Sequence, residues 1–297
     1  MTTHPPEGWK LGVRLVFADG HSHTNPVKGL GIKNIAKRFK QVNGWFIALV
    51  SLPPHHYDLD ETLEGYKKSF DILINECRVA REEGLRVACF AGIHPAEIDR
   101  MVSQNPKHSE KVIEFAEQVL NYIAKLVKDG LINGIGEIGR PHYKAAPESF
   151  VVSEIVLRRA LEVARDLQCP VHLHLEQGGF VTAKSIADAI SLLQLNREKV
   201  ILHHVDVLTA VYAQSLGLLF TVPGKLPILS EVFKRLKPVY MIESDFIDDP
   251  KRPGVSSYPW QIVENQLKLL SEGMVSEEYL YKINVDVISR VYGVTPP

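Results

Sequence analysis

The chain has 297 residues, of which 45% are hydrophobic and 23% are charged, so it can fill a sizeable core and does not have the composition of a disordered protein. Its formal net charge of -1 excludes an overall basic field for gathering nucleic acid or an anionic membrane, and leaves only a local basic groove for such partners. No window reaches the ~20 apolar residues of a spanning helix, and the N-terminus lacks the apolar run of a secretory signal, so we expect a soluble protein.

Eight short runs along the chain have the composition of strands. Most are nearly continuous in apolar residues, as expected of parallel strands that are covered on both faces. The predicted strands are Arg14–Ala18, Trp45–Ser51, Arg86–Ile93, Ile132–Ile138, Val171–Leu175, Val200–Val205, Leu218–Val222 and Val239–Ser244.

Most of the intervals between these strands have helical periodicity. Tyr66–Glu83 is rich in helix formers and is followed by Gly84, a common residue just after a helix. Ser153–Leu167 places its apolar residues on one face and its charges on the other. This alternation, with no linker, predicts one domain over residues 1–297. A (β/α)8 barrel is the preferred fold, and an open doubly wound sheet is the alternative.

The informative histidines and acids lie where the predicted strands end. In a barrel these carboxyl ends meet at one mouth, where active sites are built. The first group is FADGHSH, in which His21 and His23 are two residues apart and project from the same side of an extended chain. Two imidazoles would then face one ion, although a lone pair of this kind can also be two polar loop residues.

The next two strand ends add a histidine and a carboxylate. After the third strand, AGIHP places His94 at the same rim, where we expect it to face the substrate. In GIGEIG, Glu137 ends an apolar strand, where an unpaired carboxylate would be costly to bury. A metal would compensate its charge. A core salt bridge or a helix cap is the other interpretation.

The fifth and sixth strands each carry two histidines. In CPVHLHLE, His172 and His174 point the same way, with His174 nearer the mouth, so we choose His174 as a ligand and place His172 one layer deeper. In ILHHVD, alternation turns only one histidine toward the centre. We choose His203, and His204 then contacts substrate or is structural.

The eighth strand ends at Asp245, which can ligate a metal and also accept a proton from bound water. Imidazoles and carboxylates without cysteine suit Zn, Mn, Fe, Ni or Co, and also tolerate Mg. The candidate ligands exceed the three of a single catalytic zinc, so we expect two divalent ions bridged by Glu137, with a metal-activated hydroxide as nucleophile. The predicted ligands are His21, His23, Glu137, His174, His203 and Asp245.

In their order and context these motifs resemble the TatD family of metal-dependent deoxyribonucleases, within the amidohydrolase superfamily. The resemblance spans nearly the whole chain and implies a (β/α)8 barrel, a one- or two-metal centre and phosphodiester hydrolysis. The matching positions are 19–23 (DxHxH), 92–95 (GIHP), 136–139 (GEIG), 170–174 (PVxxH), His203 and 243–245 (E-[ST]-D).

Several positions depart from the family pattern. Arg140 and Pro141 stand where Leu-Asp is usual, and Glu176 stands where an arginine is usual, which weakens phosphate binding. The usual HCF is HHV here, and the second histidine after GIHP is Ala96, so we expect an altered substrate pocket.

Three functions follow from these motifs. The first is a hydrolase of DNA phosphodiesters with Asp245 as general base. The second is an amidohydrolase-type enzyme for a small ester, lactone, amide or phosphoester, although the subclass with a carboxylated bridging lysine is disfavoured because Glu137 occupies that site. The third is an inactive metal-binding barrel, since fold does not dictate function. No obligate protein partner is evident.

The three cysteines, Cys77, Cys89 and Cys169, have no paired spacing. Their odd number argues against a disulfide framework or a zinc knuckle, and we therefore expect a cytoplasmic protein.

Overall fold

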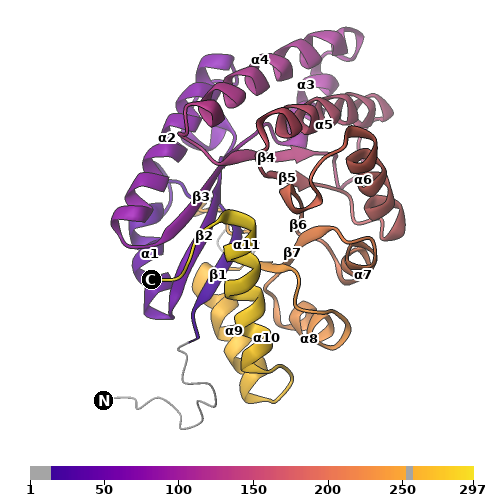
Figure 1. The fold of residues 1–297 in the computed structure, drawn as a ribbon. Helices are drawn as coiled ribbons and strands as arrows, with labels where there is room; N and C mark the ends of the chain where they lie inside the picture. The colour runs from indigo at the N-terminus through magenta and orange to yellow at the C-terminus, as the bar shows by residue number, and fades with distance from the viewer. Residues whose placement is uncertain (1–14, 252–256) are drawn as a thin grey trace.

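The computed structural model describes residues 15–251 and 257–297. Eight parallel strands pair in chain order, so the fold is the expected (β/α)8 barrel, with helices outside the strands (Figure 1). The strands are β1 Phe17–Ser22, β2 Gly44–Val50, β3 Arg86–Ala91, β4 Gly134–Gly139, β5 Val171–His174, β6 Val200–His203, β7 Leu219–Pro223 and β8 Met241–Glu243.

The helices fill the intervals between strands and follow the last strand. They are α1 Gly31–Gln41, α2 Leu63–Glu82, α3 Pro95–Gln104, α4 Ser109–Lys128, α5 Pro147–Leu167, α6 Phe180–Leu193, α7 Val207–Ser215, α8 Leu226–Arg235, α9 Pro259–Ser271, α10 Glu277–Tyr281 and α11 Val287–Tyr292. Short 3-10 turns occur at Pro54–Tyr57, Pro106–His108 and Arg197–Lys199, and Lys282–Asp286 is a π-helix. No helix in the described ranges is long and apolar enough to cross a membrane.

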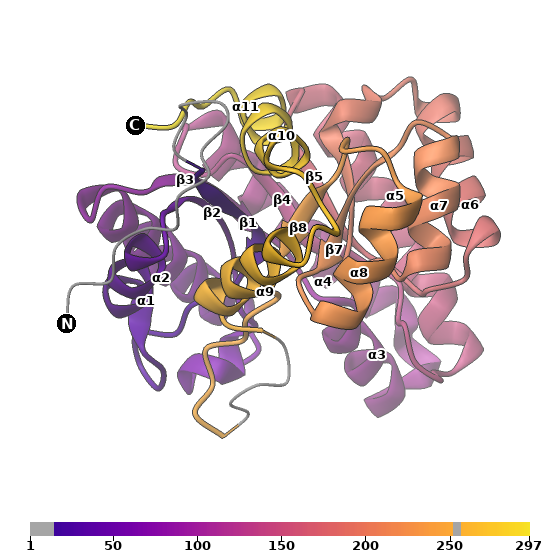
Figure 2. The ribbon, with the colours of Figure 1, turned by 90° about the horizontal axis from the view of Figure 1, so that it is seen from below.

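Alternation along the strands divides the core in two. In β2, Ile47 and Leu49 pack against the helices, whereas Phe46, Ala48 and Val50 fill the barrel interior. At the amino ends of the strands this interior is closed by the C-terminal segment: the indole N–H of Trp45 donates to the carbonyl of Asn284 (3.0 Å), and α11 packs beneath the interior core. Figure 2 shows α11 at one end of the barrel and the loop after β8 at the other.

The position of β1 corrects the predicted first strand. Prediction ended it at Ala18, but β1 runs from Phe17 through Asp19 and His21 to Ser22, and Arg14 lies outside the described residues. These polar residues are buried because residues from other parts of the barrel satisfy them: Ser244, just after β8, donates to Asp19, and the His21 ring contacts His172 of β5. The two predicted helices are confirmed as α2 and α5, and both begin earlier than predicted.

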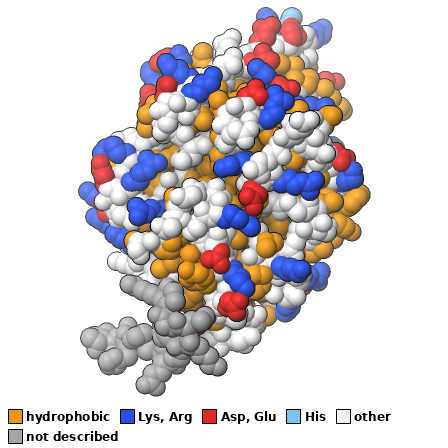
Figure 3. Space-filling view, viewed as in Figure 1, with side chains coloured by type: hydrophobic (Ala, Val, Ile, Leu, Met, Phe, Trp, Pro, Cys, Tyr) orange, Lys and Arg blue, Asp and Glu red, His pale blue; other side chains and the backbone are white. Residues whose placement is uncertain are grey.

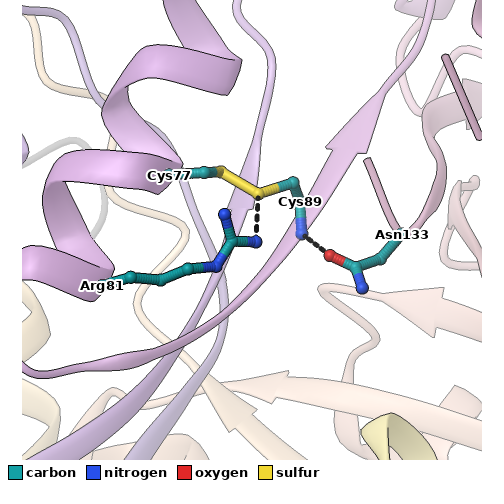
Figure 4. Close-up of a disulfide and its surroundings, with 4 residues drawn as sticks. All are labelled: Cys77, Arg81, Cys89 and Asn133. Atoms are coloured by element: carbon teal, nitrogen blue, oxygen red, sulfur yellow. Dashed lines mark hydrogen bonds between the residues drawn. A yellow bond between two sulfur atoms is a disulfide. The ribbon is translucent and has the colours of Figure 1, made fainter. Parts of the chain in front are cut away.

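Two of the cysteines form a disulfide, contrary to the sequence expectation. Cys77 of α2 and Cys89 of β3 are joined across the helix–sheet interface, with Cα atoms 6.4 Å apart (Figure 4). Alternation turns Cys89 outward, and α2 leads back onto β3, so the two side chains meet. Arg81 donates to Cys89 Sγ (3.5 Å), and the Cys89 amide donates to Asn133 (2.8 Å). Cys169 is buried and free.

Candidate metal centre

The seam between β8 and β1 brings the first histidines beside Asp245. The Asp245 amide donates to the carbonyl of His21 (3.0 Å), and the His23 amide donates to the carbonyl of Phe246 (2.8 Å). The buried carboxylate of Asp19 accepts from the amide (2.8 Å) and the hydroxyl (2.5 Å) of Ser244. Burial raises the pKa of Asp19 to about 7, despite these bonds. These bonds between the ends of β1 and β8 fix the positions of His21, His23 and Asp245 relative to one another.

Glu137 lies at the centre of the mouth, on the buried strand β4. Gly92 of the GIHP motif allows this close approach, because a Cβ at Gly92 would lie 2.2 Å from the carbonyl oxygen of Glu137. The two carboxylate oxygens of Glu137 face different imidazoles. Oε1 is 3.2 Å from Nε2 of His21 and 2.9 Å from Nε2 of His23.

The other oxygen, Oε2, faces a second group of imidazoles. It is 2.7 Å from Nδ1 of His174, 3.2 Å from Nε2 of His203 and 3.3 Å from Nε2 of His94. The ring of His203 also stacks on that of His21, with centroids 3.9 Å apart. The structure thus brings five of the predicted residues, four ligands and His94, around the sixth, Glu137.

Hydrogen bonds on the far side of two rings fix their free nitrogens. His23 Nδ1 lies 3.0 Å from the carbonyl of Val50, which only accepts, so the neutral ring has its Nε2 lone pair toward Glu137. His203 Nδ1 lies 3.2 Å from the buried carboxylate of Glu243, with the same consequence for its Nε2. Both rings are therefore oriented as metal ligands usually are.

His94 differs from these rings. Its Nδ1 accepts from the amide of Ala96 (3.0 Å) at the start of α3, so the neutral ring has its proton on Nε2. That N–H points at Glu137 Oε2. His94 is therefore better suited to donate a hydrogen bond, to a substrate oxygen or to a carboxylate, than to ligate a metal.

Asp245 lies at the open edge of the cluster. Its Oδ1 is 3.9 Å from Nε2 of His23, and its side chain is 32% exposed. Burial raises the pKa of Asp245 to about 7, although the charge of His203 acts in the opposite direction. Burial also raises the pKa of Glu137, but the imidazoles outweigh it, those of His203 and His94 foremost, and leave the pKa well below its ordinary value.

Of the paired histidines, the structure places His203, and not His204, against Glu137. His204 instead lies with Nε2 3.3 Å from Nδ1 of His174, and Gln177 donates to its carbonyl (2.9 Å). His172 lies one layer deeper in the barrel than His174, as its position in the strand predicts. Burial lowers the pKa of His172 and of His174 to about 3, so both rings are neutral at ordinary pH.

Sequence reasoning missed two residues at the site. His142, in the loop after β4, has Nδ1 2.5 Å from Nε2 of His174. Because His142 lies in a loop, no helix or strand periodicity in the sequence indicates where its side chain points. Glu243 had a signal: it ends β8, two residues before Asp245, and a buried acid in an apolar run needs a partner. Its Oε1 has no hydrogen-bond partner in the part of the chain that the structure describes.

Two of the departures from the family pattern, Arg140 and Glu176, pair with each other. Nε and Nη2 of Arg140 donate to the two oxygens of Glu176 (2.8 Å each), and Nη1 donates to Glu154 (3.1 Å). Glu176 also accepts from the hydroxyl of Thr182 (2.8 Å). Arg140 is therefore engaged by carboxylates and is not presented to a substrate phosphate.

These donors fit divalent cations. Imidazole nitrogens and carboxylate oxygens converge in overlapping groups, each with possible ligand atoms within 4.8 Å of one another. Two groups are buried, His21, His23 and Glu137, and His21, His203 and Glu243. In the third, Glu137 and His174 lie with the part-exposed His94, which the Ala96 amide orients as a donor in its neutral form. The buried Glu137 carboxylate is compensated by imidazoles, and the raised pKa values of His203 and His23 mean that protons on these rings balance its charge, a role that a divalent cation would take over. The mixed nitrogen and oxygen set suits borderline metals such as zinc, cobalt, nickel and iron.

The sequence model of the TatD related DNase family matches residues 18–293. This chain belongs to that family. The TatD-family chain is thus a metal-dependent hydrolase of the amidohydrolase superfamily, as its motifs predicted. It is also 28% identical over 283 residues to an uncharacterized protein, MJ1127, of Methanocaldococcus jannaschii, a match that covers 94% of this chain and 96% of the other.

Solved structures of low identity share the fold. A TatD homolog of Escherichia coli K12, YJJV, superposes with a TM-score of 0.62 at 17% identity, over 94% of this chain and 98% of that one. A TatD-like protein of Archaeoglobus fulgidus gives 0.55 at 16% identity, over 89% and 99%. A mutant organophosphorus hydrolase of Deinococcus radiodurans gives 0.61 at 13% identity, over 93% of each chain.

Proposed function

We propose that this TatD-family chain hydrolyses phosphodiester bonds of DNA with two divalent cations held at the barrel mouth. The observation that carries the proposal is the position of Glu137, whose two oxygens face two different groups of imidazoles. His21 and His23 would hold one cation with Oε1, and His174 and His203 the other with Oε2. Asp245 would complete the first group from the edge, and its Oδ1 lies 3.9 Å from Nε2 of His23.

Divalent cations in such a site acidify bound water and offset charge that develops on the reacting group. The chain's own residues supply the remaining chemistry. Asp245 accepts a proton from the attacking water, because its carboxylate is partly exposed at the mouth beside His23 and its pKa is raised to about 7. His94 directs its Nε2–H toward the same space and donates to a substrate oxygen.

A second candidate is hydrolysis of a small ester, lactone or phosphoester. The Arg140–Glu176 pair favours it, because the arginine is held by two carboxylates instead of facing a phosphate chain. The fold neighbours include an organophosphorus hydrolase, but at that identity the likeness concerns the barrel only.

The test is to remove metal with a chelator, restore zinc, manganese, magnesium, nickel, cobalt or iron(II) one at a time, and assay each form. The substrates are labelled single-stranded DNA, an aryl phosphodiester, and a panel of small esters and lactones. Metal-restored DNA cleavage supports the first candidate, and turnover of small esters alone supports the second. Absence of any metal-restored hydrolysis contradicts both and leaves an inactive metal-binding barrel.

A further inference from the structure

A chain of hydrogen bonds connects the candidate metal centre to the closed end of the barrel. Nδ1 of His21 lies 3.0 Å from Nδ1 of His172, and Nε2 of His172 lies 3.0 Å from the hydroxyl of Tyr292 on α11. The other nitrogen of His21, Nε2, faces Glu137. His21 and His172 are fully buried, and the His172 ring packs on Phe90 with centroids 4.2 Å apart.

A neutral imidazole has one proton, so one choice fixes the direction of every bond in this chain. If His21 Nε2 donates to Glu137, then His21 Nδ1 must accept from His172 Nδ1. His172 Nε2 is then an acceptor, and the Tyr292 hydroxyl donates to it. All three bonds are satisfied in this direction, which suits a centre without a cation at His21.

A cation on His21 Nε2 requires the opposite direction. The proton of His21 must then be on Nδ1 and is donated to His172 Nδ1. His172 therefore has its own proton on Nε2, and the Tyr292 oxygen accepts it. The proton count is unchanged. Nε2 of His21 gives up its proton to solvent at the mouth, the shared hydrogen passes from His172 to His21, and His172 Nε2 takes the hydroxyl hydrogen of Tyr292, which solvent replaces at this part-exposed residue.

We propose that His172 and Tyr292 are positioning residues that set the tautomer of His21, and that this hydrogen-bond chain reverses when a divalent cation binds. The proposal rests on the proposed cation site at His21. It gives α11 a part in metal binding, although this helix lies at the end of the barrel opposite the mouth (Figure 2). A purely structural polar contact in the core would require neither reversal nor any effect on metal affinity.

The first test is Tyr292→Phe, which removes only the hydroxyl. The ring contacts with Phe46 and Phe90 can remain, at centroid distances of 4.8 and 6.1 Å. We expect affinity for Zn²⁺, measured by competition with a chelator, to fall about tenfold to hundredfold, as is usual when an outer partner of a ligating histidine is lost. The matched control is Tyr240→Phe, which removes another buried hydroxyl, bonded to Tyr279 (3.1 Å), and should leave Zn²⁺ affinity unchanged.

The second test measures the tautomers directly by nitrogen-15 NMR of the imidazoles. His172 should be protonated on Nδ1 in the chelated protein and on Nε2 with Zn²⁺. His172→Gln keeps an oxygen that can accept from His21 Nδ1 and should retain more affinity than His172→Phe, at equal folded content by circular dichroism.

The outcomes separate the two proposals. If the wild-type chain binds no Zn²⁺ or other divalent cation, the proposed function is wrong. If the wild type binds Zn²⁺ but Tyr292→Phe binds it equally well, or the His172 tautomer does not change, only the reversal is wrong.

Discussion

The carboxylate of Glu137 faces both groups of imidazoles, with Oε1 toward His23 and Oε2 toward His174, so both of its oxygens are engaged. Glu137→Gln keeps the volume of the side chain but replaces one carboxylate oxygen by an amide NH2 group, which donates hydrogen bonds and cannot ligate a cation. We expect hydrolysis to fall at least about a hundredfold, more than the loss typical of an outer partner. Bound metal, measured by atomic spectroscopy, should fall as well.

The control for this substitution is Glu162→Gln. Glu162 pairs with Arg159 on the surface of α5, away from the mouth, so its loss should change neither metal content nor rate. A Glu137→Gln protein that keeps its full complement of metal would contradict the bridging role.

Sequence reasoning located the groups around Glu137 because strand ends in a barrel share one mouth. The sequence could not predict which residues these groups are hydrogen-bonded to. His172 meets Tyr292, which is 120 residues later in the chain, and His203 meets Glu243, which is 40 residues later. Such pairs depend on the closure of the barrel, and no local spacing indicates them. The Asp245 side chain was found at the predicted rim, although more exposed than a fully enclosed ligand.

The strand ends β4 and β5 are joined by Arg140 and Glu176, which depart from the family pattern together. The Arg140 side chain is only 13% exposed, so Arg140→Leu leaves the Glu176 carboxylate partly buried without its forked partner. We expect a loss of about 1–3 kcal/mol in the free energy of unfolding, measured with urea. The double variant Arg140→Leu, Glu176→Leu should lose less than the sum of the single losses, because it leaves no unpaired charge. Additive losses would indicate that the pair is not coupled.

Two elements show where local patterns fail. The first strand was predicted to end at Ala18 because Asp19 and Gly20 interrupt an apolar run, yet β1 continues through them since Ser244 satisfies Asp19. The Cys77–Cys89 pair was missed because its spacing in sequence carries no signal. The alternation of strands and helices, by contrast, follows from burial alone and was predicted within a few residues for the other seven strands.

Buried neutral imidazoles make the stability of the metal-free protein depend on pH. Burial is the first cause that lowers the pKa of His21, His172, His174 and His204 below the ordinary 6.5. A group with a lowered pKa in the folded state contributes stability above its unfolded pKa, and that contribution is lost as the pH falls toward the folded value. The raised pKa values of Asp19 and Asp245, about 7, act in the opposite direction, because the contribution of these carboxyls to the stability of the folded protein is lost as the pH rises from about 4 to 7.

The raised pKa values of His23 and His203 also favour the folded protein at low pH. The pKa values of His56 and His142 are lowered like those of the four rings above, so six imidazoles with a lowered pKa outnumber these four groups with a raised pKa. We therefore expect the chelated protein to be less stable at pH 5 than at pH 7.5. The difference should be on the order of a few kcal/mol in urea unfolding. Equal stability at both values would contradict the burial of neutral rings. On the face drawn in Figure 3, basic and acidic side chains are interspersed.

The seam between β1 and β8 contains both the backbone bonds that close the barrel and the side chains proposed to hold a cation. Any fluctuation that parts these two strands must separate His23 from Asp245, so a bound ion opposes the opening itself. Deuterium uptake at the amides of His23 and Asp245 should therefore slow when Zn²⁺ is added, while uptake in the exposed turn at Gly273 stays constant. A bound ion would therefore stabilise the closure of the barrel, and its removal would allow β1 and β8 to separate before the other strand pairs do.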